Sequence, residues 1–229
     1  MADVLLIRHG QASFGAADYD CLSTIGEEQS RHLGQWFRQT GQSPDLIATG
    51  SMRRHIHTAD LCAEAAGVAA SRITLAGLDE MDHVEVLTRY RPDLVEPGAL
   101  VAELARAEDP HRAFQSLYAA AAARWISGGF DDEYACTWGR FRANVLAGLD
   151  ALAMHAAGTI WAFTSGGPIA VIANALLGAP IDHVFTLAWP LVNTSISRIS
   201  TGAKRSQLIG YNAWPHLEVA GESRLITHR

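Results

Sequence analysis

The sequence has few cysteines and no excess of positive charge. Its three cysteines are widely spaced and include no Cys-x-x-Cys pair, which argues against a disulfide framework or a zinc site and favours reduced thiols. The formal net charge is −6 at pH 7, whereas binding to nucleic acid or to an anionic membrane requires a basic face. We therefore expect neither partner, and any positive charge that binds a substrate must be local.

The sequence also lacks an uninterrupted apolar stretch long enough to cross a membrane. The apolar run at residues 4–7 is short, and Asp3 precedes it where a secretion signal would carry basic residues. The most apolar later stretch, residues 169–192, is interrupted by glycine, proline, aspartate and histidine. These features predict a soluble protein, no membrane partner and a cytoplasmic location.

What is present fits an ordinary globular protein. The chain has 229 residues, of which 48% are hydrophobic and 18% charged, as expected for one large domain or one domain with an insertion. Short apolar runs alternate with helical patterns, and this order predicts an α/β fold with a mostly parallel central sheet and helices on both faces. The expected strands are residues 4–7, 46–49, 72–76, 159–164, 192–200 and 207–211.

Helical patterns fill the segments between these strands. Thr24 belongs to a capping-box pattern at the start of the first helix, and Ser51 is the expected N-cap of the second. Residues 82–136 contain no clear strand, which predicts a mostly helical insertion into a single domain that covers residues 1–229. The other expected helices cover residues 24–41, 51–66, 138–156 and 168–177.

Four polar clusters directly follow four predicted strands. In an open α/β sheet, the crevice beyond the carboxyl ends of the strands is the usual ligand site. A guanidinium beside an imidazole is well suited to bind a phosphate group. The free backbone N–H groups at the start of a helix attract anions, and an arginine on the first turn of that helix strengthens the attraction. The clusters are Arg8-His9-Gly10-Gln11, residues 51–54, Asp79-Glu80 and Thr164-Ser165-Gly166-Gly167.

The order of these motifs resembles that of the histidine phosphatase superfamily. That family carries R-H-G-[EQ], L-[ST]-x-x-G, S-x-x-x-R-A-x-x-T-A, L-x-E, S-H-G-G and a late H-L. The resemblance extends from residue 3 to about residue 217 and implies a phosphoglycerate-mutase-like fold and a phosphohydrolase that acts on a small phosphomonoester. The matching segments are Arg8-His9-Gly10-Gln11, Leu22-Ser23-x-x-Gly26, Arg54-x-x-x-Thr58-Ala59, Leu78-Asp79-Glu80 and His216-Leu217.

The resemblance also implies a role for individual residues. His9 is the nucleophile that becomes a phosphohistidine, and Glu80 is the general acid and base. Arg8 and Arg54 neutralise the oxygens of the phosphoryl group. The implied substrate contacts are Gly10, Gln11, Ser23, Ser165 and Gly166. We expect no cofactor and no metal, because no group of residues has the spacing of a metal site.

The chain departs from the family pattern at its second histidine. Ser165 stands at that position before Gly166-Gly167, and a serine hydroxyl donates a hydrogen bond but carries no charge. Either the phosphate clamp is weaker, or another cation substitutes. His83 is the only histidine in a motif-bearing loop that is available for this, although an exposed histidine is the simpler interpretation. His55 and His57 diverge on the predicted helix, which makes them a poor metal pair.

Other functions stay open at this point. A mutase is disfavoured because the family's Gly-Trp segment and asparagine are replaced by Phe14-Gly15 and Asp18-Tyr19-Asp20. Ser165 as a nucleophile is disfavoured because Phe163 breaks the G-x-S-x-G pattern. A weak or inactive module that binds a phosphate ligand would carry the same motifs. The sequence leaves open both the oligomeric state and the identity of the phosphoester.

Overall fold

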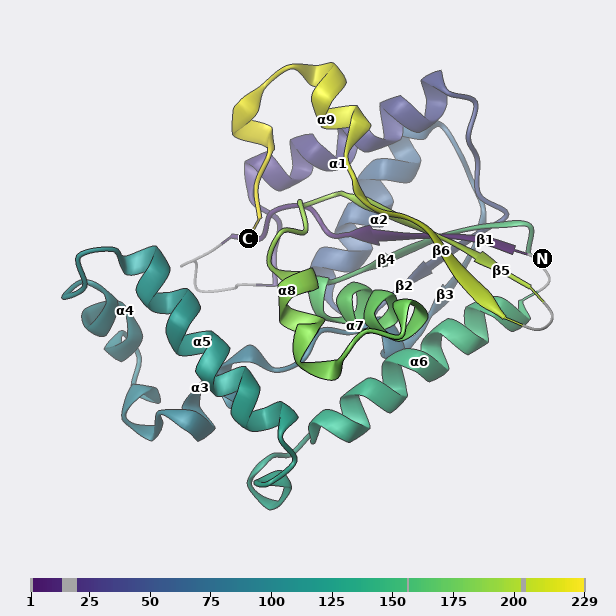
Figure 1. Ribbon diagram of the computed structural model, residues 1–229. Helices are drawn as coiled ribbons and strands as arrows, with labels where there is room; N and C mark the ends of the chain where they lie inside the picture. Colours follow the sequence, from purple (N-terminus) through teal and green to yellow (C-terminus); the bar gives the residue numbers. More distant parts are fainter. Residues whose placement is uncertain (1, 14–19, 156, 203–204, 229) are drawn as a thin grey trace. The chain divides into compact units, whose positions relative to one another are not determined.

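The computed structural model describes residues 2–13, 20–155, 157–202 and 205–228 (Figure 1). Contacts within the chain divide it into two compact units. The first unit comprises Met1–Glu80 and Asn144–Arg229, and the second comprises Met81–Ala143. The predicted site residues all belong to the first unit.

A six-stranded sheet forms the centre of the first unit within the described residues. Its strand order is β3-β2-β4-β1-β5-β6, with the first four strands parallel and the last two antiparallel to their neighbours. The predicted α/β class with a mostly parallel sheet is therefore confirmed. The strands are β1 (Ala2–Arg8), β2 (Leu46–Thr49), β3 (Ser71–Thr74), β4 (Thr159–Thr164), β5 (Ile196–Thr201) and β6 (Ser206–Ala213).

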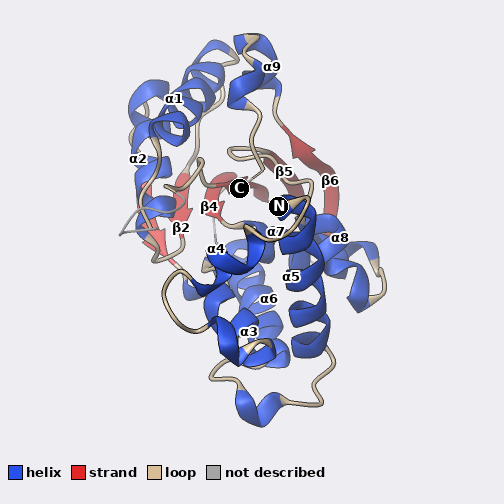
Figure 2. Cartoon of the chain, turned by 90° about the vertical axis from the view of Figure 1, so that its left-hand side faces the viewer, coloured by secondary structure: helices blue, strands red, loops and turns tan. Residues whose placement is uncertain are grey.

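Helices lie on both faces of this sheet (Figures 1 and 2). On one face, α1 and α2 pack with Leu5, Ile47 and Trp161 of the central strands into a buried apolar cluster. Strands buried on both faces need apolar residues at nearly every position, which explains why the predicted strands are continuous apolar runs. The helices are α1 (Thr24–Gln39), α2 (Arg53–Ala66), α6 (Trp138–Met154), α7 (Gly166–Leu177), α8 (Val184–Ala188) and α9 (Pro215–Ala220).

The second unit is helical in its described part, with α3 (His83–Tyr90), α4 (Ala99–Leu104), α5 (Pro110–Ile126) and the start of α6. Trp125 is almost fully buried, and its ring lies 5.2 Å from that of Trp138 and 5.6 Å from that of Phe141. Aromatic rings therefore form the centre of this unit. That residues 82–136 are an insertion into a single domain stays a prediction.

Two expected helix caps are wrong. The N-cap of α1 is Ser23 and not Thr24, because the Ser23 hydroxyl accepts the backbone N–H of Gly26. Helix α2 starts after Met52, and Ser51 does not cap it because its hydroxyl donates to Asp79 at 2.7 Å. A contact with a residue distant in sequence takes Ser51 away from the start of α2, whereas the cap of α1 is a local bond that lies one residue before the predicted position.

Three expected element boundaries also differ from the structure. β5 begins at Ile196 and not at residue 192, because the preceding segment turns at Thr194 with a φ of 63°. β3 ends at Thr74, and a short 3₁₀ helix follows at Ala76–Leu78. Helix α7 starts at Gly166, two residues before the expected start. Among the described residues, no helix combines the length and the apolar character needed to cross a membrane.

Candidate active site

His9 follows directly after β1, at the carboxyl end of the parallel strands. Its backbone N–H donates to the Thr164 carbonyl at the end of β4 over 2.9 Å. Its carbonyl accepts a hydrogen bond from the side-chain amide of Asn193 over 3.0 Å. The side chain is only 6% exposed. Backbone contacts from two neighbouring elements therefore fix the position of the imidazole.

The two ring nitrogens of His9 have different partners. Nδ1 lies 2.7 Å from the Gly10 carbonyl oxygen. A carbonyl oxygen only accepts, so Nδ1 carries the proton and Nε2 holds the lone pair. Nε2 accepts a hydrogen bond from Nε of Arg54 over 3.3 Å. The free lone pair of His9 therefore faces a guanidinium, the group that also suits a phosphoryl oxygen.

The pKa of His9 lies well below its ordinary value. Burial of the ring is the largest cause, followed by the charge of Arg54 and then by His55 and Arg8, while the hydrogen bond to Gly10 opposes the lowering. A lowered pKa keeps the imidazole neutral at pH 7. The neutral form is the one with a lone pair available for attack on phosphorus.

The predicted anion-binding features of α2 are present, and a carboxylate occupies them. Arg54 is 5% exposed, and its Nη1 lies 2.8 Å from Oδ1 of Asp20. Oδ2 of Asp20 accepts the backbone N–H of Arg53 over 2.8 Å. The helix N-terminus and the guanidinium therefore bind an anionic group, as their charges predict. Asp20 was not among the predicted site residues.

Gly10 explains why several motifs of the sequence occur together. A Cβ atom at Gly10 would lie 2.4 Å from the carbonyl oxygen of Gly26, and one at Gly26 would lie 2.2 Å from that of Gln11. The backbone N–H of Gly10 donates to Oγ1 of Thr58 on α2 over 3.0 Å. The loop at residues 8–11, here called the nucleophile loop after the role predicted for His9, therefore packs closely against α1 and α2.

Gln11 and Ser23 are bonded to each other. The Ser23 hydroxyl donates to Oε1 of Gln11 over 2.8 Å and also caps α1. The backbone N–H of Gln11 donates to Oε1 of Gln29 over 2.9 Å. These bonds fix the nucleophile loop, and a direct substrate contact by Gln11 or Ser23 stays a prediction.

Arg8 and Glu80 lie close to the start of α7. Arg8 donates to the carbonyl of Leu191 and, over 3.1 Å, to that of His228. A Cβ atom at Gly166 would lie 3.9 Å from Nε of Arg8. Oε2 of Glu80 accepts the backbone N–H of Gly167 over 3.1 Å. The turn at residues 164–167, here called the β4–α7 turn, therefore brings a cation and a carboxylate to the same helix end.

Ser165 begins α7 but does not cap it. It is the N-cap residue, yet its side chain makes no capping hydrogen bond. Its Oγ instead lies 2.7 Å from Nε2 of His55 on α2, and both side chains are fully buried. The ring of His55 lies 5.6 Å from that of His9, between ring centroids. The predictions considered His55 only as a metal ligand and missed this contact.

His216, the late histidine of the sequence, supports the backbone of His9 through Thr194 and Asn193. Nε2 of His216 lies 2.8 Å from Oγ1 of Thr194, whose hydroxyl proton goes to the Asn193 carbonyl over 2.6 Å. The hydroxyl has one proton, so His216 is the donor in its bond. Asn193 in turn holds the carbonyl of His9. His216 therefore positions the turn that fixes His9.

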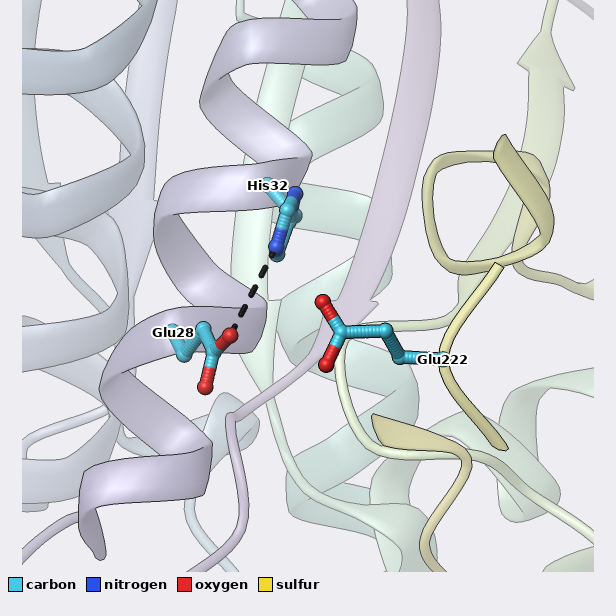
Figure 3. Close-up of side chains that lie close together, drawn as sticks. All are labelled: Glu28, His32 and Glu222. Carbon is cyan, nitrogen blue, oxygen red and sulfur yellow. Dashed lines mark ion pairs between the residues drawn. The ribbon is translucent and has the colours of Figure 1, made fainter. Parts of the chain in front are cut away.

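One further group has the composition of a metal site (Figure 3). Glu28 and His32 on α1 lie close to Glu222, with 3.9 Å between the carboxylate of Glu28 and Nε2 of His32. Arg224 donates two hydrogen bonds to Glu28, over 2.8 and 2.7 Å, and one to Glu222 over 2.8 Å. The guanidinium already neutralises these carboxylates, so this group is a surface ion-pair network.

The comparison with protein families confirms the resemblance to the histidine phosphatase superfamily. The model of the histidine phosphatase superfamily (branch 1) matches residues 4–213. The chain belongs to the histidine phosphatase superfamily. The match includes the nucleophile loop, Arg54, Glu80 and the β4–α7 turn, which the fold brings to the carboxyl ends of β1, β2 and β4.

Similar proteins include both mutases and phosphatases. A 2,3-bisphosphoglycerate-dependent phosphoglycerate mutase from Thermobifida fusca (strain YX) is 35% identical over 75 residues, which covers 30% of this chain and 30% of that enzyme. The match thus spans less than a third of the curated relative. It shows local similarity within the superfamily and leaves the activity of the whole protein to be proposed.

Two solved structures share the fold of this superfamily member. Phosphoglycerate mutase from Bacillus anthracis str. Sterne is 15% identical with a TM-score of 0.63, over 96% of this chain and 97% of that one. Phosphoserine phosphatase from Entamoeba histolytica, in complex with 3-phosphoglyceric acid, is 19% identical with a TM-score of 0.61, over 95% and 100%. At these identities the likeness confirms the phosphoglycerate-mutase-like fold alone.

Two predictions about this superfamily member, His83 as a substitute cation and the argument against a mutase, stay predictions. His83, considered as a substitute cation, belongs to the second unit, where its Nδ1 lies 2.5 Å from the Tyr118 hydroxyl. The argument against a mutase used Phe14-Gly15 and Asp18-Tyr19, which lie outside the described residues. The signal that would have found His55 was its place in the R-A-x-x-T-A motif, where the family has alanine.

Proposed function

We propose that this protein is a phosphohydrolase that releases phosphate from a small phosphomonoester through a phosphohistidine on His9. The observation that carries the proposal is the pair of contacts made by the His9 ring. Gly10 holds the proton on Nδ1, and Nε2 faces Arg54 over 3.3 Å. A phosphoryl oxygen bound to that guanidinium would bring phosphorus next to the lone pair.

The proposed reaction has two steps. In the first, Nε2 of His9 attacks phosphorus, the bond from phosphorus to the ester oxygen breaks, and Glu80 gives its proton to that oxygen. In the second, Glu80 takes a proton from water, the water oxygen attacks phosphorus, and the bond to His9 breaks. Inorganic phosphate leaves and the enzyme is restored. Arg8 and Arg54 neutralise the phosphoryl oxygens throughout.

The proposed substrate contacts come from both sides of the site. Gly10 and Gln11 lie on the nucleophile loop, where Ser23 fixes them. Ser165 and Gly166 begin α7, whose first N–H groups suit an anion. Cys62 and Cys136 form no disulfide, which fits the proposed reducing, cytoplasmic setting for the reaction.

The experiment that tests the proposal traps the phosphoenzyme. We expect an alkaline denaturing quench during turnover of para-nitrophenyl phosphate to leave a protein phosphate that is stable in base and is lost on later exposure to acid, as phosphohistidine is. His9→Ala should form none and should lose phosphate release by about 10⁴-fold or more. Turnover by His9→Ala within tenfold of wild type, or an acid-stable phosphoserine, would overturn the assignment of His9.

A mutase is the second candidate, favoured by the local match to 2,3-bisphosphoglycerate-dependent mutases. Phosphorus NMR with 3-phosphoglycerate and a catalytic amount of 2,3-bisphosphoglycerate separates the two activities. A phosphohydrolase accumulates inorganic phosphate, whereas a mutase accumulates 2-phosphoglycerate with little phosphate release. Tight binding of inorganic phosphate without either product would identify a module that binds a phosphate ligand and does not turn over.

A further inference from the structure

Two departures from the family pattern meet in space. The family has alanine after the arginine of R-A-x-x-T-A, and this chain has His55 there. The family has histidine in S-H-G-G, and this chain has Ser165 there. Nε2 of His55 and Oγ of Ser165 lie 2.7 Å apart and are fully buried. An imidazole is thus present beside the β4–α7 turn, but it comes from α2.

The space for this imidazole is built by its surroundings. A Cβ atom at Gly50 would lie 2.4 Å from Nδ1 of His55 and 2.5 Å from Oδ1 of Asp79. Asp79 is held by Ser51, whose backbone N–H and hydroxyl donate to it over 2.5 and 2.7 Å. Nδ1 of His55 lies 4.0 Å from Oδ1 of Asp79. The ring therefore lies between a carboxylate and the Ser165 hydroxyl, in space that the glycine leaves open.

His55 and Ser165 also lie close to the residues that attack or bind the phosphoryl group in the proposed reaction. The rings of His55 and His9 are 5.6 Å apart between centroids. Arg54, the neighbour of His55 on α2, holds the lone pair of His9. Ser165 starts the helix whose Gly167 N–H holds Glu80. Ser165 therefore lies at the start of the same helix that holds the proposed acid, and its partner His55 lies beside the proposed nucleophile.

We propose that His55 and Ser165 together replace the second histidine of the family. This inference rests on the proposed function. Ser165 donates its hydroxyl proton to a phosphoryl oxygen, and His55 is the positioning residue that donates Nε2–H to Oγ of Ser165. A hydroxyl has one proton, so it is available to the substrate only when His55 is the donor in their bond.

Substrate binding selects this direction of the bond. In the structure the pKa of His55 is lowered to about 3, first by burial and then by the charge of Arg54, while Glu80 and Asp20 oppose the lowering. A bound phosphoryl dianion adds negative charge beside the ring and raises its pKa, which favours a proton on the ring. A proton on Nε2 is donated to Ser165, and a second proton on Nδ1 would face Asp79. The charged or titratable groups that face the ring are Arg54, Asp79, Glu80, Asp20 and His9.

An exchange of the two residues tests the inference. His55→Ala and Ser165→His should each lower kcat for para-nitrophenyl phosphate about ten- to a hundredfold, the first by loss of the donor and the second by crowding against His55. The double variant H55A/S165H restores the family arrangement and should exceed either single variant by about tenfold or more. His57→Ala, two residues along the same helix, is the matched control and should behave as wild type.

Two further measurements separate this role from a purely structural one. His55→Gln keeps an N–H donor toward Oγ of Ser165 and should recover part of the kcat that His55→Ala loses, about threefold or more. Thermal unfolding of each variant shows whether it is folded. A double variant no better than the single ones, His55→Ala with kcat within threefold of wild type, or His55→Gln no better than His55→Ala, would overturn the inference.

The inference and the proposed function fail in distinguishable ways. If wild type forms no phosphohistidine, the proposed function fails, and calorimetric titration with inorganic phosphate still tests the pair. His55→Ala should then bind inorganic phosphate about tenfold more weakly than wild type, and the double variant should recover this affinity. Equal affinity in wild type and His55→Ala would overturn the inference. If wild type turns over and His55→Ala is unaffected, the inference alone fails.

Discussion

The two sides of the site are built in different ways. On the nucleophile loop, the backbone of His9 and Gly10 is held by Gly26, Thr58 and Asn193, and this side follows the family motifs. On the β4–α7 turn, the family's histidine is absent and an imidazole from another helix touches Ser165. A substitution rarely changes which backbone groups contact each other, so an arrangement fixed by the backbone is difficult to alter. The role of a single side chain can instead be taken over by a side chain from a neighbouring element.

Removal of Arg54 is the severest test of the nucleophile side. Its guanidinium contacts Nε2 of His9, so Arg54→Ala should lose about 3–4 kcal/mol of transition-state stabilisation, on the order of a hundred- to a thousandfold in kcat/KM. Arg53→Ala changes an exposed side chain on the same turn and should stay within about threefold of wild type. Equal losses in the two variants, measured by steady-state kinetics, would contradict the assignment.

Glu80→Gln tests the carboxylate held at the β4–α7 turn. A glutamine cannot protonate a leaving oxygen, so phosphoenzyme formation from an alkyl phosphate should slow by about 10²-fold or more. An aryl ester such as para-nitrophenyl phosphate leaves without that proton and should slow much less. Rapid-quench measurement of phosphoenzyme formation compares the two substrates directly. Equal losses with both would show that Glu80 is not the acid.

Two glycine substitutions compare the packing of the two sides. Gly10→Ala places Cβ 2.4 Å from a backbone oxygen, so the loop must move, at a cost of about 1–3 kcal/mol in unfolding free energy. At Gly166 the nearest atom lies at 3.8 Å, and alanine also favours a helix, so Gly166→Ala should change this free energy by less than about 0.5 kcal/mol. Urea unfolding measures both, and a greater loss for Gly166→Ala would refute the comparison.

Acid should lower the free energy of unfolding, because buried histidines lie on both sides of the site. Burial lowers the pKa of His216, behind the nucleophile loop, and of His55 to about 3, from an ordinary value of 6.5. The folded protein keeps these rings neutral while the unfolded chain takes up protons below pH 6.5. Unfolding free energy should therefore be steady above about pH 6.5 and fall toward pH 3, by at most about 1.4 kcal/mol per pH unit for each histidine.

His216→Asn isolates the contribution of His216 to the loss of unfolding free energy in acid. Asparagine keeps a donor toward Thr194 and has no proton to gain, so its stability should decline less steeply in acid than that of wild type. Urea unfolding at several pH values between 7 and 4 gives both slopes. Stability that rises on acidification, or identical slopes in the two proteins, would contradict the linkage.

Much of the fold follows from local sequence pattern. The strands at residues 46–49 and 159–164 match the predicted ranges, because a run of apolar residues bounded by polar ones has few other conformations that bury it. The expected cap of α2 and the expected start of β5 were wrong because tertiary contacts compete with local signals, whereas the cap of α1 was misplaced by one residue. Asp79 takes the hydroxyl of Ser51, and Thr194 turns the chain before Ile196.

The residues of the candidate site could be predicted where they belong to one sequence motif. They could not be predicted where the contact joins two elements that are distant in sequence. His9, Arg54 and Glu80 were named from their motifs, and the structure brings them to one edge of the sheet. His55 was missed because its partner, Ser165, is far away in sequence, and helical spacing on α2 alone gives no sign of it. Asp20 was missed for the same reason, since only the fold places it on Arg54.

The pairing of β1 has a consequence for the order of folding. β1 pairs with β4 and β5, which follow it in sequence by some 150 to 200 residues, and Gln29 on α1 bonds to Leu225. Contacts between such distant segments form late, because the long intervening chain must be closed before they contribute. During synthesis the segment with His9 therefore waits for β4 and β5 to leave the ribosome. His9 is therefore synthesised early but positioned late, so a truncated or stalled chain carries His9 without the candidate site around it.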